Sequence, residues 1–179
     1  MLDNELIALV LTTLIAQESI AGISGTPIKQ AFQPTQQGAN VQPTGYFYKV
    51  GDRRRGYPFR EDVYDSDQQA MVHTEKQAYE TTFQISVLAT QNPSTPTQYT
   101  ASDILNLIAY ILQSAQTVAA LEAQSVGILH IGDVRNPYFV DDRQRFEASP
   151  SLDFTLTHYQ VITSTMPVVS TTEYQILTV

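Results

Sequence analysis

The sequence predicts an α+β fold, in which a mostly antiparallel β-sheet carries two main helices packed on one face and a long protruding β-hairpin. Apolar residues recur with the period of a helix at 3–17 and again from Ile104 onward. They alternate with polar residues, as in strands, at 83–90 and 152–157. The order is helix, strands, helix, strands, and 179 residues with 42% hydrophobic content suffice for a single domain over 1–179.

The first predicted helix covers residues 3–17. Its inward stripe consists of two adjacent ridges, Leu6, Val10 and Leu14 beside Ile7, Leu11 and Ile15. Acidic residues in the first turn complement the helix dipole. The acidic start is unlike a signal peptide, and the apolar run 6–16 is shorter than the ~20 residues of a membrane span. The sequence therefore indicates an amphipathic helix and no membrane partner.

An irregular segment, residues 18–43, follows the first helix. Gly and Pro punctuate it, its only charges are Glu18 and Lys29, and 28–32 is expected to form a short edge strand. A loop this long tends to be functional or to pack on a neighbouring molecule. The candidate interface residues in this extended loop are Ile28, Lys29, Phe32, Gln33 and Gln36.

An arginine-rich segment then separates two extended stretches. Residues 46–50 are predicted to form one strand and 71–89 another. If 44–52 pairs with 62–76, residues 51–62 form the tip of the long hairpin. The candidate interface residues at this tip are Arg53, Arg54, Arg55, Tyr57, Phe59 and Arg60.

Three interpretations of the arginine cluster remain open. Arginine forks pair bidentately with carboxylates, and arginine with aromatic residues is enriched at interface anchors, so the tip could dock on an acidic face of a partner protein. It could touch DNA phosphates transiently. It could also balance Asp52, Glu61 and Asp62 on an exposed hairpin, since surface ion pairs are common and weak.

The second half of the chain is predicted to add one helix and several strands. A turn at 92–97 precedes the segment 100–103, Thr-Ala-Ser-Asp, which is a capping box in its Asp form. The helix that follows is expected to bury Ile104, Leu107, Ile108, Ile111 and Leu112 and to continue through Val118 and Leu121. After it come a buried strand at 126–131, a turn-like connection at 135–147, a half-buried strand at 152–157 and a last strand at 172–179.

The chain carries little charge, and that charge is mostly negative. Charged residues make up 16% of it, below the usual ~25%. Gln, Thr, Ser and Asn replace them, which is typical of a surface that meets other protein, or of a low-charge extracellular domain. The net charge of −8 disfavours affinity for DNA, which comes largely from Lys and Arg. A channel through which DNA slides would tolerate this charge.

No residue pattern in the sequence predicts catalysis. The acidic run 61–67 resembles a calcium loop, but Ala70 and Lys76 stand where the loop glycine and the bidentate glutamate belong. No Gly-x-Ser-x-Gly turn exposes a nucleophile, and the absence of cysteine excludes thiolate metal sites. The histidines lack the spacing of a zinc site and are expected to be structural or interface residues; they are His73, His130 and His158. The sequence therefore predicts no enzyme activity, no cofactor and no metal.

The order of segments resembles that of phage neck and tail-terminator proteins, the head–tail joining family. The likeness rests on the opening helix at 6–15, the stretch 28–37 that leads through Pro43 and Tyr46 into a strand, the strand at 82–88 with the helix after it, and 143–147 before a final pair of strands. In layout it covers most of the chain.

This resemblance implies a homo-oligomeric ring, most often of six subunits, that joins the head connector to the tail and encloses a channel for DNA. It implies that the protein contacts other neck, connector and tail proteins and that DNA passes through without sequence-specific binding. It also implies that the protein has no enzymatic activity. The expected location is the neck of the virion, after assembly in the host cytoplasm. A stand-alone binding module, such as a phage adhesin or receptor-binding domain, is the alternative, and an unrecognised hydrolase is another.

Overall fold

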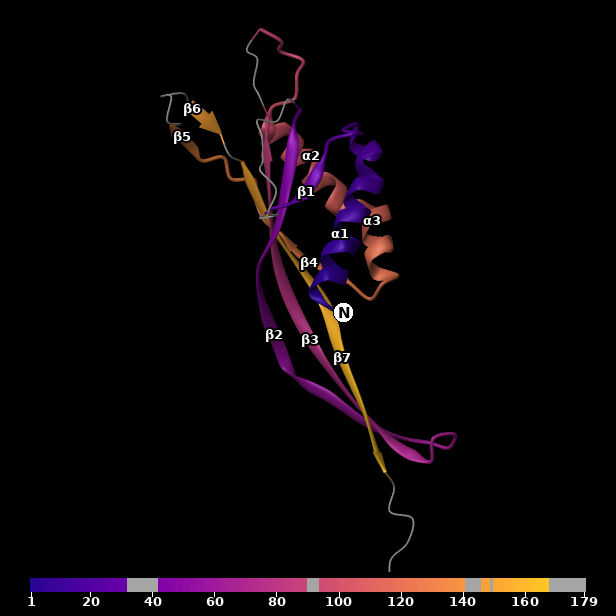
Figure 1. Cartoon of the computed structure of the whole chain (residues 1–179). Coiled ribbons are helices and arrows are strands. Elements are labelled where there is room, and N and C mark those ends of the chain that lie inside the picture. The colour runs from indigo at the N-terminus through magenta and orange to yellow at the C-terminus, as the bar shows by residue number, and fades with distance from the viewer. Residues whose placement is uncertain (32–41, 90–93, 141–145, 149, 168–179) are drawn as a thin grey trace, which may run out of the picture.

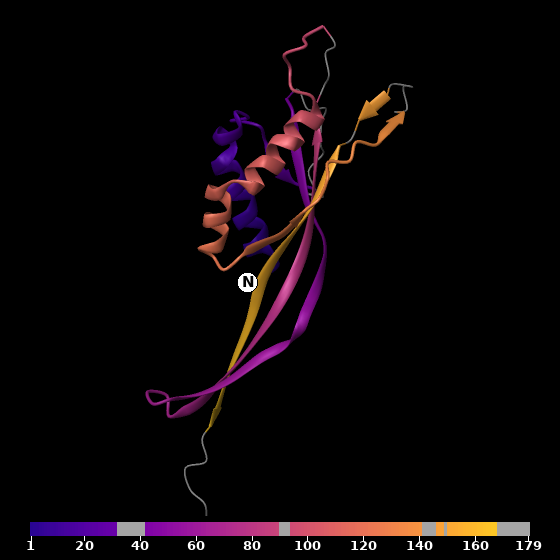
Figure 2. The same ribbon diagram turned by 180° about the vertical axis from the view of Figure 1, so that it is seen from behind.

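The computed structural model describes residues 1–31, 42–89, 94–140, 146–148 and 150–167 of the chain (Figure 1). A five-stranded sheet has the order β1-β2-β3-β7-β4, in which β1 and β2 are parallel and the other pairs antiparallel. The three α-helices lie on one face of this sheet and cover only part of its length (Figures 1 and 2). The predicted α+β class is thus confirmed.

The helices are α1 (Asp3–Gln17), α2 (Ala101–Gln113) and α3 (Ala115–Glu122), with a 3-10 turn η1 (Glu18–Ala21) after α1. The strands are β1 (Ile28–Gln30), β2 (Thr44–Asp65), β3 (Ala70–Leu88), β4 (Gly127–Ile131), β5 (Tyr138–Val140), β6 (Phe146–Ala148) and β7 (Ser151–Pro167). Strands β5 and β6 pair with each other in a separate two-stranded sheet.

Helix α1 has the predicted bounds. Leu6, Val10 and Leu14 are buried in the core, and the Glu5 carboxylate accepts a hydrogen bond from the Leu2 N–H at 2.7 Å. With η1, the stretch Asp3–Ala21 has 19 residues and a mean hydropathy of 1.2, so by length and composition it is apolar enough to cross a membrane. The buried ridge of Leu6, Val10 and Leu14 matches the predicted amphipathic helix, but Ile15 of the second predicted ridge is 50% exposed.

The core lies between the helices and the sheet, around three stacked phenylalanine rings. Phe47, Phe83 and Phe154 come from β2, β3 and β7 and are fully buried. Their ring centroids lie 4.8 Å apart for Phe47 and Phe83 and 5.7 Å apart for Phe83 and Phe154. Alternate residues of a strand share a face, so Ile85 and Leu152 face the same helices. The period-two patterns at 83–90 and 152–157 therefore marked the core face correctly.

The long hairpin is confirmed, but its turn is not where the sequence predicted. Strand β2 pairs with β3 from Thr44 opposite Leu88 to Asp65 opposite Ala70, so the turn consists of residues 66–69. The predicted pairing of 44–52 with 62–76 is wrong. The arginine-rich segment 51–62 lies within a strand, away from the tip.

A bulge in β2 explains why this strand looked like a loop. The pairing with β3 shifts between Arg55 and Phe59. Within the shift, Gly56 has a φ of 63°, which glycine adopts without strain. The Gln77 side-chain amide donates to the carbonyl oxygens of Arg55 and Gly56 at 3.1 and 3.4 Å. Pro58, which has no N–H to donate to a neighbouring strand, also falls inside the bulge.

Strands β2, β3 and β7 continue past the helices as a three-stranded extension, which we call the arm (Figures 1 and 2). It comprises residues 53–65, 70–80 and 158–167. Strand β1 pairs only with residues 45–47 of β2, and β4 only with residues 154–157 of β7. The arm therefore has two edges, β2 and β7, which no other strand covers in the part of the chain that the structure describes.

The helix predicted after Thr100 begins as expected and then breaks. The capping box is present: the Asp103 N–H donates to Thr100 Oγ1 at 3.1 Å, and the Thr100 N–H donates to the Asp103 carboxylate at 2.9 Å. Helix α2 ends at Gln113, and α3 begins at Ala115 at an angle of 55° to it, with Ser114 between them. The Ser114 hydroxyl accepts from the Thr117 N–H at 3.3 Å. The expected continuation through Leu121 is wrong because Ser114 caps a second helix.

We expect Asp103→Ala to lower the free energy of unfolding by about 1 kcal/mol, because it removes half of the capping box. Hydrogen bonds from Thr100, first of all from its N–H, lower the pKa of Asp103. The ionised cap therefore stabilises the fold at pH values above about 3.9, the pKa of Asp103 in the unfolded chain. This stabilisation is lost as the pH falls through the lower pKa of Asp103 in the folded chain. Urea unfolding at pH 7 and at pH 3 checks this, and an effect of D103A that persists undiminished at pH 3 would contradict the ionic part of the cap.

Strand β4 differs from the predicted buried strand. Val126 is buried, but Leu129 and His130 are exposed, because β4 is the outer strand of the sheet and, among the described strands, pairs only with β7. A run of apolar residues does not separate an outer strand from a central one. Burial of β4 was therefore the wrong prediction, although its existence was right.

The irregular stretches contain more structure than expected. The segment 18–43 includes η1 and β1, and β1 covers the first three residues of the predicted 28–32 strand. The connection at 135–147 includes β5 and part of β6, and the half-buried strand at 152–157 extends to Pro167. The last predicted strand, 172–179, lies outside the described residues.

Candidate protein interface

The arm carries half of the chain's ten Lys and Arg residues, and its arginines point to both faces of the sheet. Arg54 pairs with Tyr79, which lies on the same face as Thr81 and Phe83, so it points to the helix side. Arg53 pairs with Glu80 and points to the opposite side. The arm cations are Arg53, Arg54, Arg55, Arg60 and Lys76.

Only part of this positive charge is neutralised within the chain. Arg60 pairs with Glu75 at 2.8 Å, and Arg55 lies 3.7 Å from Glu80. Arg53 and Arg54 are exposed and form no ion pair with any described residue. Asp52, Glu61 and Asp62, which the sequence offered as partners, are not the residues that balance the cluster.

The two aromatic candidates are also exposed. Tyr57 lies in the bulge and is 97% exposed, and Phe59 directly follows the bulge and is 63% exposed. Large apolar side chains are costly to leave in water, and an exposed apolar surface rimmed by polar residues commonly marks an interaction site. Tyr57 and Phe59 therefore extend the arginine cluster into a mixed cationic and aromatic surface.

The loop candidates divide differently. Ile28 is only 6% exposed, and its side chain packs so closely on Gly45 that a methyl group added to this glycine would lie 3.4 Å from it. Ile28 therefore belongs to the core. Lys29, the next residue of β1, is exposed. Phe32, Gln33 and Gln36 lie outside the described residues.

The helical layer has a net negative charge, because no Lys or Arg offsets its acidic residues. Residues 1–28 and 77–134, which include all three α-helices, contain no Lys or Arg. The acidic residues in the same two segments are Asp3, Glu5, Glu18, Glu80, Asp103, Glu122 and Asp133. The helical layer of one copy is thus complementary in charge to the arginines on the arm of another.

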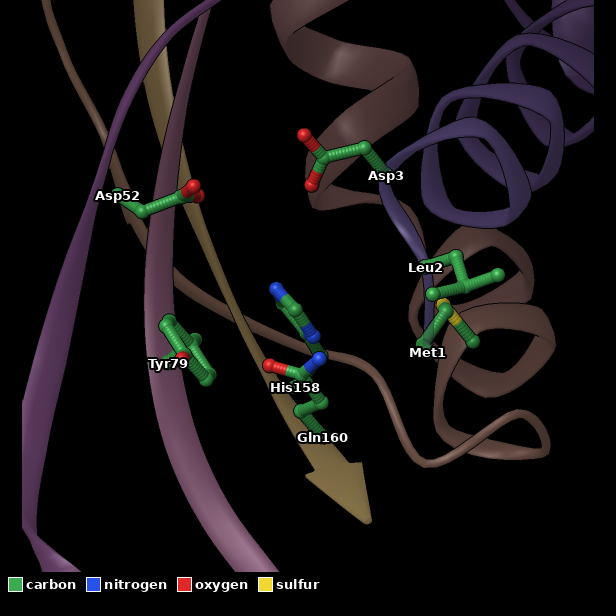
Figure 3. Close-up of a pocket in the computed structure, with 7 residues that line it drawn as sticks. All are labelled: Met1, Leu2, Asp3, Asp52, Tyr79, His158 and Gln160. Atoms are coloured by element: carbon green, nitrogen blue, oxygen red, sulfur yellow. The ribbon is translucent and has the colours of Figure 1, made fainter. Parts of the chain in front are cut away.

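A chain of polar contacts joins the arm to helix α1. His158 Nε2 lies 2.9 Å from Thr81 Oγ1, which in turn donates to Asp52 Oδ1 at 2.6 Å. Lys49 pairs with Asp52 and, at 2.7 Å, with Asp3 at the start of α1. These residues come from β7, β3, β2 and α1, so the contacts hold the base of the arm against the helical layer. Figure 3 shows three of them, Asp3, Asp52 and His158.

These contacts border an open pocket of about 370 Å³, which is lined by residues 1–3, Asp52, Tyr79, His158 and Gln160 (Figure 3). Burial raises the pKa of Asp52, but hydrogen bonds from Lys49 and Thr81 lower it overall, so this carboxylate is ionised and can only accept. The Thr81 hydroxyl therefore donates to Asp52, and His158 Nε2 carries the proton that Thr81 accepts. In this arrangement the histidine does not take a proton from the hydroxyl, as activation of a nucleophile would require.

We expect His158 to make the protein less stable as the pH falls below about 6.5. Burial and the nearby N-terminal ammonium of Met1 lower the pKa of His158, as does Lys49, while Asp52 and Asp3 act in the opposite direction. The unfolded chain binds a proton at His158 more readily than the folded chain does. The contribution of His158 to stability is therefore fully present above its pKa in the unfolded chain, and it is lost as the pH falls towards its lower pKa in the folded chain. His158→Gln should remove this decline between pH 7 and pH 5, measured by urea unfolding.

His73→Gln provides a control of opposite sign. Hydrogen bonds to Asp62, at 2.6 Å, and to Glu75 raise the pKa of His73. The contribution of protonated His73 to stability is present below pH 6.5 and is lost as the pH rises through the raised pKa of His73 in the folded chain. H73Q should therefore leave the acid-side decline in place or make it steeper. An unchanged pH profile in H158Q would contradict the account of the buried histidine.

Sequence reasoning did not find these contacts, because Asp52, Thr81 and His158 lie far apart in the sequence and only the strand register brings them together. It also left residues 158–167 unassigned, although their uncharged, β-branched composition is typical of a strand. Among the described residues, no group of three His, Cys, Asp or Glu side chains is placed to hold a metal ion.

Comparison with known proteins identifies one family. A family model described as "E217 gateway protein gp29" matches residues 5–168, nearly the whole chain. No curated protein matches. The match includes the helical layer, all of the strands and the arm.

Proposed function

We propose that this chain, which belongs to the E217 gateway protein gp29 family of phage head–tail structural proteins, forms a closed ring that joins the head connector to the tail and encloses the DNA channel. Six subunits are the expected number. The ring has the role of a tail terminator, contacts other neck, connector and tail proteins, and takes its place in the virion neck after assembly in the host cytoplasm. It acts by contact and catalyses no reaction.

One observation carries this proposal: beyond its base, which contacts α1, the arm extends past the helical layer with both faces and both edges exposed. Exposed residues on a monomer are ordinary when they are polar, but the exposed residues of the arm include large apolar side chains. Those with about half or more of their area exposed are Tyr57, Phe59, Val63, Tyr64, Val161 and Ile162. Such a surface is expected to be covered by protein in the working assembly.

Contacts between identical subunits are heterologous in a ring, so two different surfaces must match. The arginines of the arm supply one surface and the cation-free helical layer supplies the other. Lys29, together with Phe32, Gln33 and Gln36, is placed on the loop that would hold a neighbouring subunit. Arg53, Arg54, Arg55, Tyr57, Phe59 and Arg60 are proposed to contact a neighbouring subunit or ring.

The charge of the chain supports passage of DNA without sequence-specific binding. A surface without Lys or Arg has no groups to neutralise phosphates, so DNA does not adhere to it. The net charge of −8 makes a ring of several copies strongly acidic. We therefore place the arginines towards a neighbouring protein, because arginines that lined the lumen would slow the DNA.

Immunogold labelling of intact particles tests the location. An antibody raised against residues 101–122 should label particles at the junction of head and tail, or label only particles in which that junction has been opened. Label on fibres or on the distal tip of the tail would contradict the proposal and favour a receptor-binding role.

A further inference from the structure

We propose that neighbouring copies join through the edges of their arms, with residues 161–167 of β7 in one copy forming a parallel strand pair with residues 59–65 of β2 in the next. At the level of these segments the arms then form one continuous sheet around the ring, and Arg53, Arg54 and Arg55 lie outside the paired segments. This inference rests on the proposed ring and specifies how its subunits meet.

The β7 edge of the arm lacks the usual protection against strand pairing. Residues 158–167 contain no Asp, Glu, Lys or Arg, and no glycine, and their one proline is the last residue. β-Branched residues at 161, 162, 163 and 165 favour an extended backbone. Natural edge strands are normally short, charged, bulged or covered, because a long uncharged edge pairs with other strands. This edge is therefore suited to accept a strand.

The backbone of β7 presents hydrogen-bonding groups along this edge. Ser151 exchanges two backbone hydrogen bonds with Arg135, on the side away from β3, and the Asp153 carbonyl accepts from the Gly132 N–H on that same side. The pairing of β7 with β3 has no bulge from Ser86 opposite Ser151 to Ala70 opposite Pro167. The backbone N–H and C=O groups of odd-numbered residues of β7 therefore point away from β3 along the whole strand, and at the arm these are residues 161, 163 and 165.

The segment of β2 at the same level of the arm has matching length and direction. Residues 70–76 of β3 pair with 161–167 of β7 on one side and with 59–65 of β2 on the other. Each segment has seven residues without a bulge, and both run towards the turn at 66–69. Rotation about an axis along the arms places equal levels of neighbouring copies side by side, so these two segments would meet as parallel strands.

The side chains of the two segments also suit each other. Val161 shares a sheet face with Phe59 and Val63, and Ile162 and Met166 share the other face with Tyr64. All six are between 46% and 63% exposed in the single chain. The charged residues of the β2 segment would meet an uncharged edge, with no like charge opposite them. A second copy of this chain is thus the occupant that both edges favour.

The absence of cysteine from the chain allows a direct test by cross-linking. Within one copy, Glu61 and Thr163 both pair with Thr74 and lie on opposite sides of it. They are about two strand spacings, or ~10 Å, apart, beyond the ~7 Å limit for a disulfide. In Glu61→Cys/Thr163→Cys, oxidation should give a ladder of covalent multimers up to the ring on a non-reducing gel.

The matched control moves one cysteine to the other face of the same strand. Asp62→Cys/Thr163→Cys should give at least tenfold less of the ladder, because residue 62 points to the opposite side of the sheet. Rings that assemble without a ladder from the first pair would overturn the edge pairing and leave the proposed ring intact. Dimers from Thr163→Cys alone would indicate pairing of two β7 edges, which also overturns it. A parent protein that never forms rings would contradict both proposals.

A backbone variant tests the same edge without cysteines. Thr163→Pro removes an outward N–H and leaves the bonds to β3, which come from even-numbered residues of β7. We expect the concentration for half-assembly to rise at least about tenfold, the equivalent of one lost hydrogen bond. Thr163→Ala keeps the N–H, so it should change the concentration for half-assembly by less than about threefold. Equal assembly of the two variants, with equal melting temperatures, would overturn the proposal.

Discussion

Replacing Arg53, Arg54 and Arg55 together by Ser is expected to abolish ring assembly while leaving the fold intact. Two of these side chains have no ion-pair partner among the described residues, and Arg55 has only a long contact to Glu80. If each arginine pairs with a carboxylate of the next copy, losing three such contacts weakens assembly by on the order of 100-fold or more. Size-exclusion chromatography with light scattering measures the loss.

Two controls separate the interface from the fold. The melting temperature of the Ser variant should stay within about 2 °C of the parent, because exposed substitutions rarely change stability by more than ~0.5 kcal/mol. Replacing the same three residues by Lys retains the charge but not the bidentate geometry, so assembly should fall between the two. Normal rings from the Ser variant would show that the arginines are not the contact.

The largest expected effect on stability comes from Phe83→Ala. Phe83 packs against both Phe47 and Phe154, and all three rings are fully buried where β2, β3 and β7 meet the helices. Removing this ring leaves a cavity beneath the helical layer, at a cost of about 3–5 kcal/mol in the free energy of unfolding. Urea unfolding of the purified chain measures it.

Phe59→Ala is the matched substitution outside the core. Phe59 lies on the arm and is exposed, so its removal should change the free energy of unfolding by less than ~0.5 kcal/mol. It should instead weaken assembly, because Phe59 belongs to the proposed interface. A loss of stability in Phe59→Ala that equals the loss in Phe83→Ala would contradict this division between core and interface.

The local features of the fold could be predicted because their causes are local. The ridge of Leu6, Val10 and Leu14 defines one face of a helix, and the Thr100–Asp103 capping box fixes where α2 begins. Strand alternation from Phe83 onward identified the core face. Each of these signals depends on residues within a few positions of one another.

The register of the long hairpin could not be predicted for the opposite reason. Residues 59–65 carry charges at positions that a strand in a globular core would not tolerate, so they suggested a loop. They form a strand because β3 pairs with them along an exposed arm, where neither face is covered. Gly56 and Pro58 mark a bulge as readily as a turn, and only the partner strand decides between the two.

The candidate site shows the same division. The arginine cluster is visible in the sequence because its residues are adjacent, but its partners Glu75 and Glu80 lie on the next strand and depend on the register. The uncharged β7 edge was missed, because an unprotected edge is a property of the sheet, in which only the order of strands shows which strand is outermost.

The mass of the assembled protein tests the central claim most directly. Native mass spectrometry of the purified chain, and of necks released from particles, should give a closed assembly at a whole multiple of 19.9 kDa, with six copies expected. A monomer of 19.9 kDa in solution and a single copy per neck in the particle would contradict the claim that this protein works as a ring.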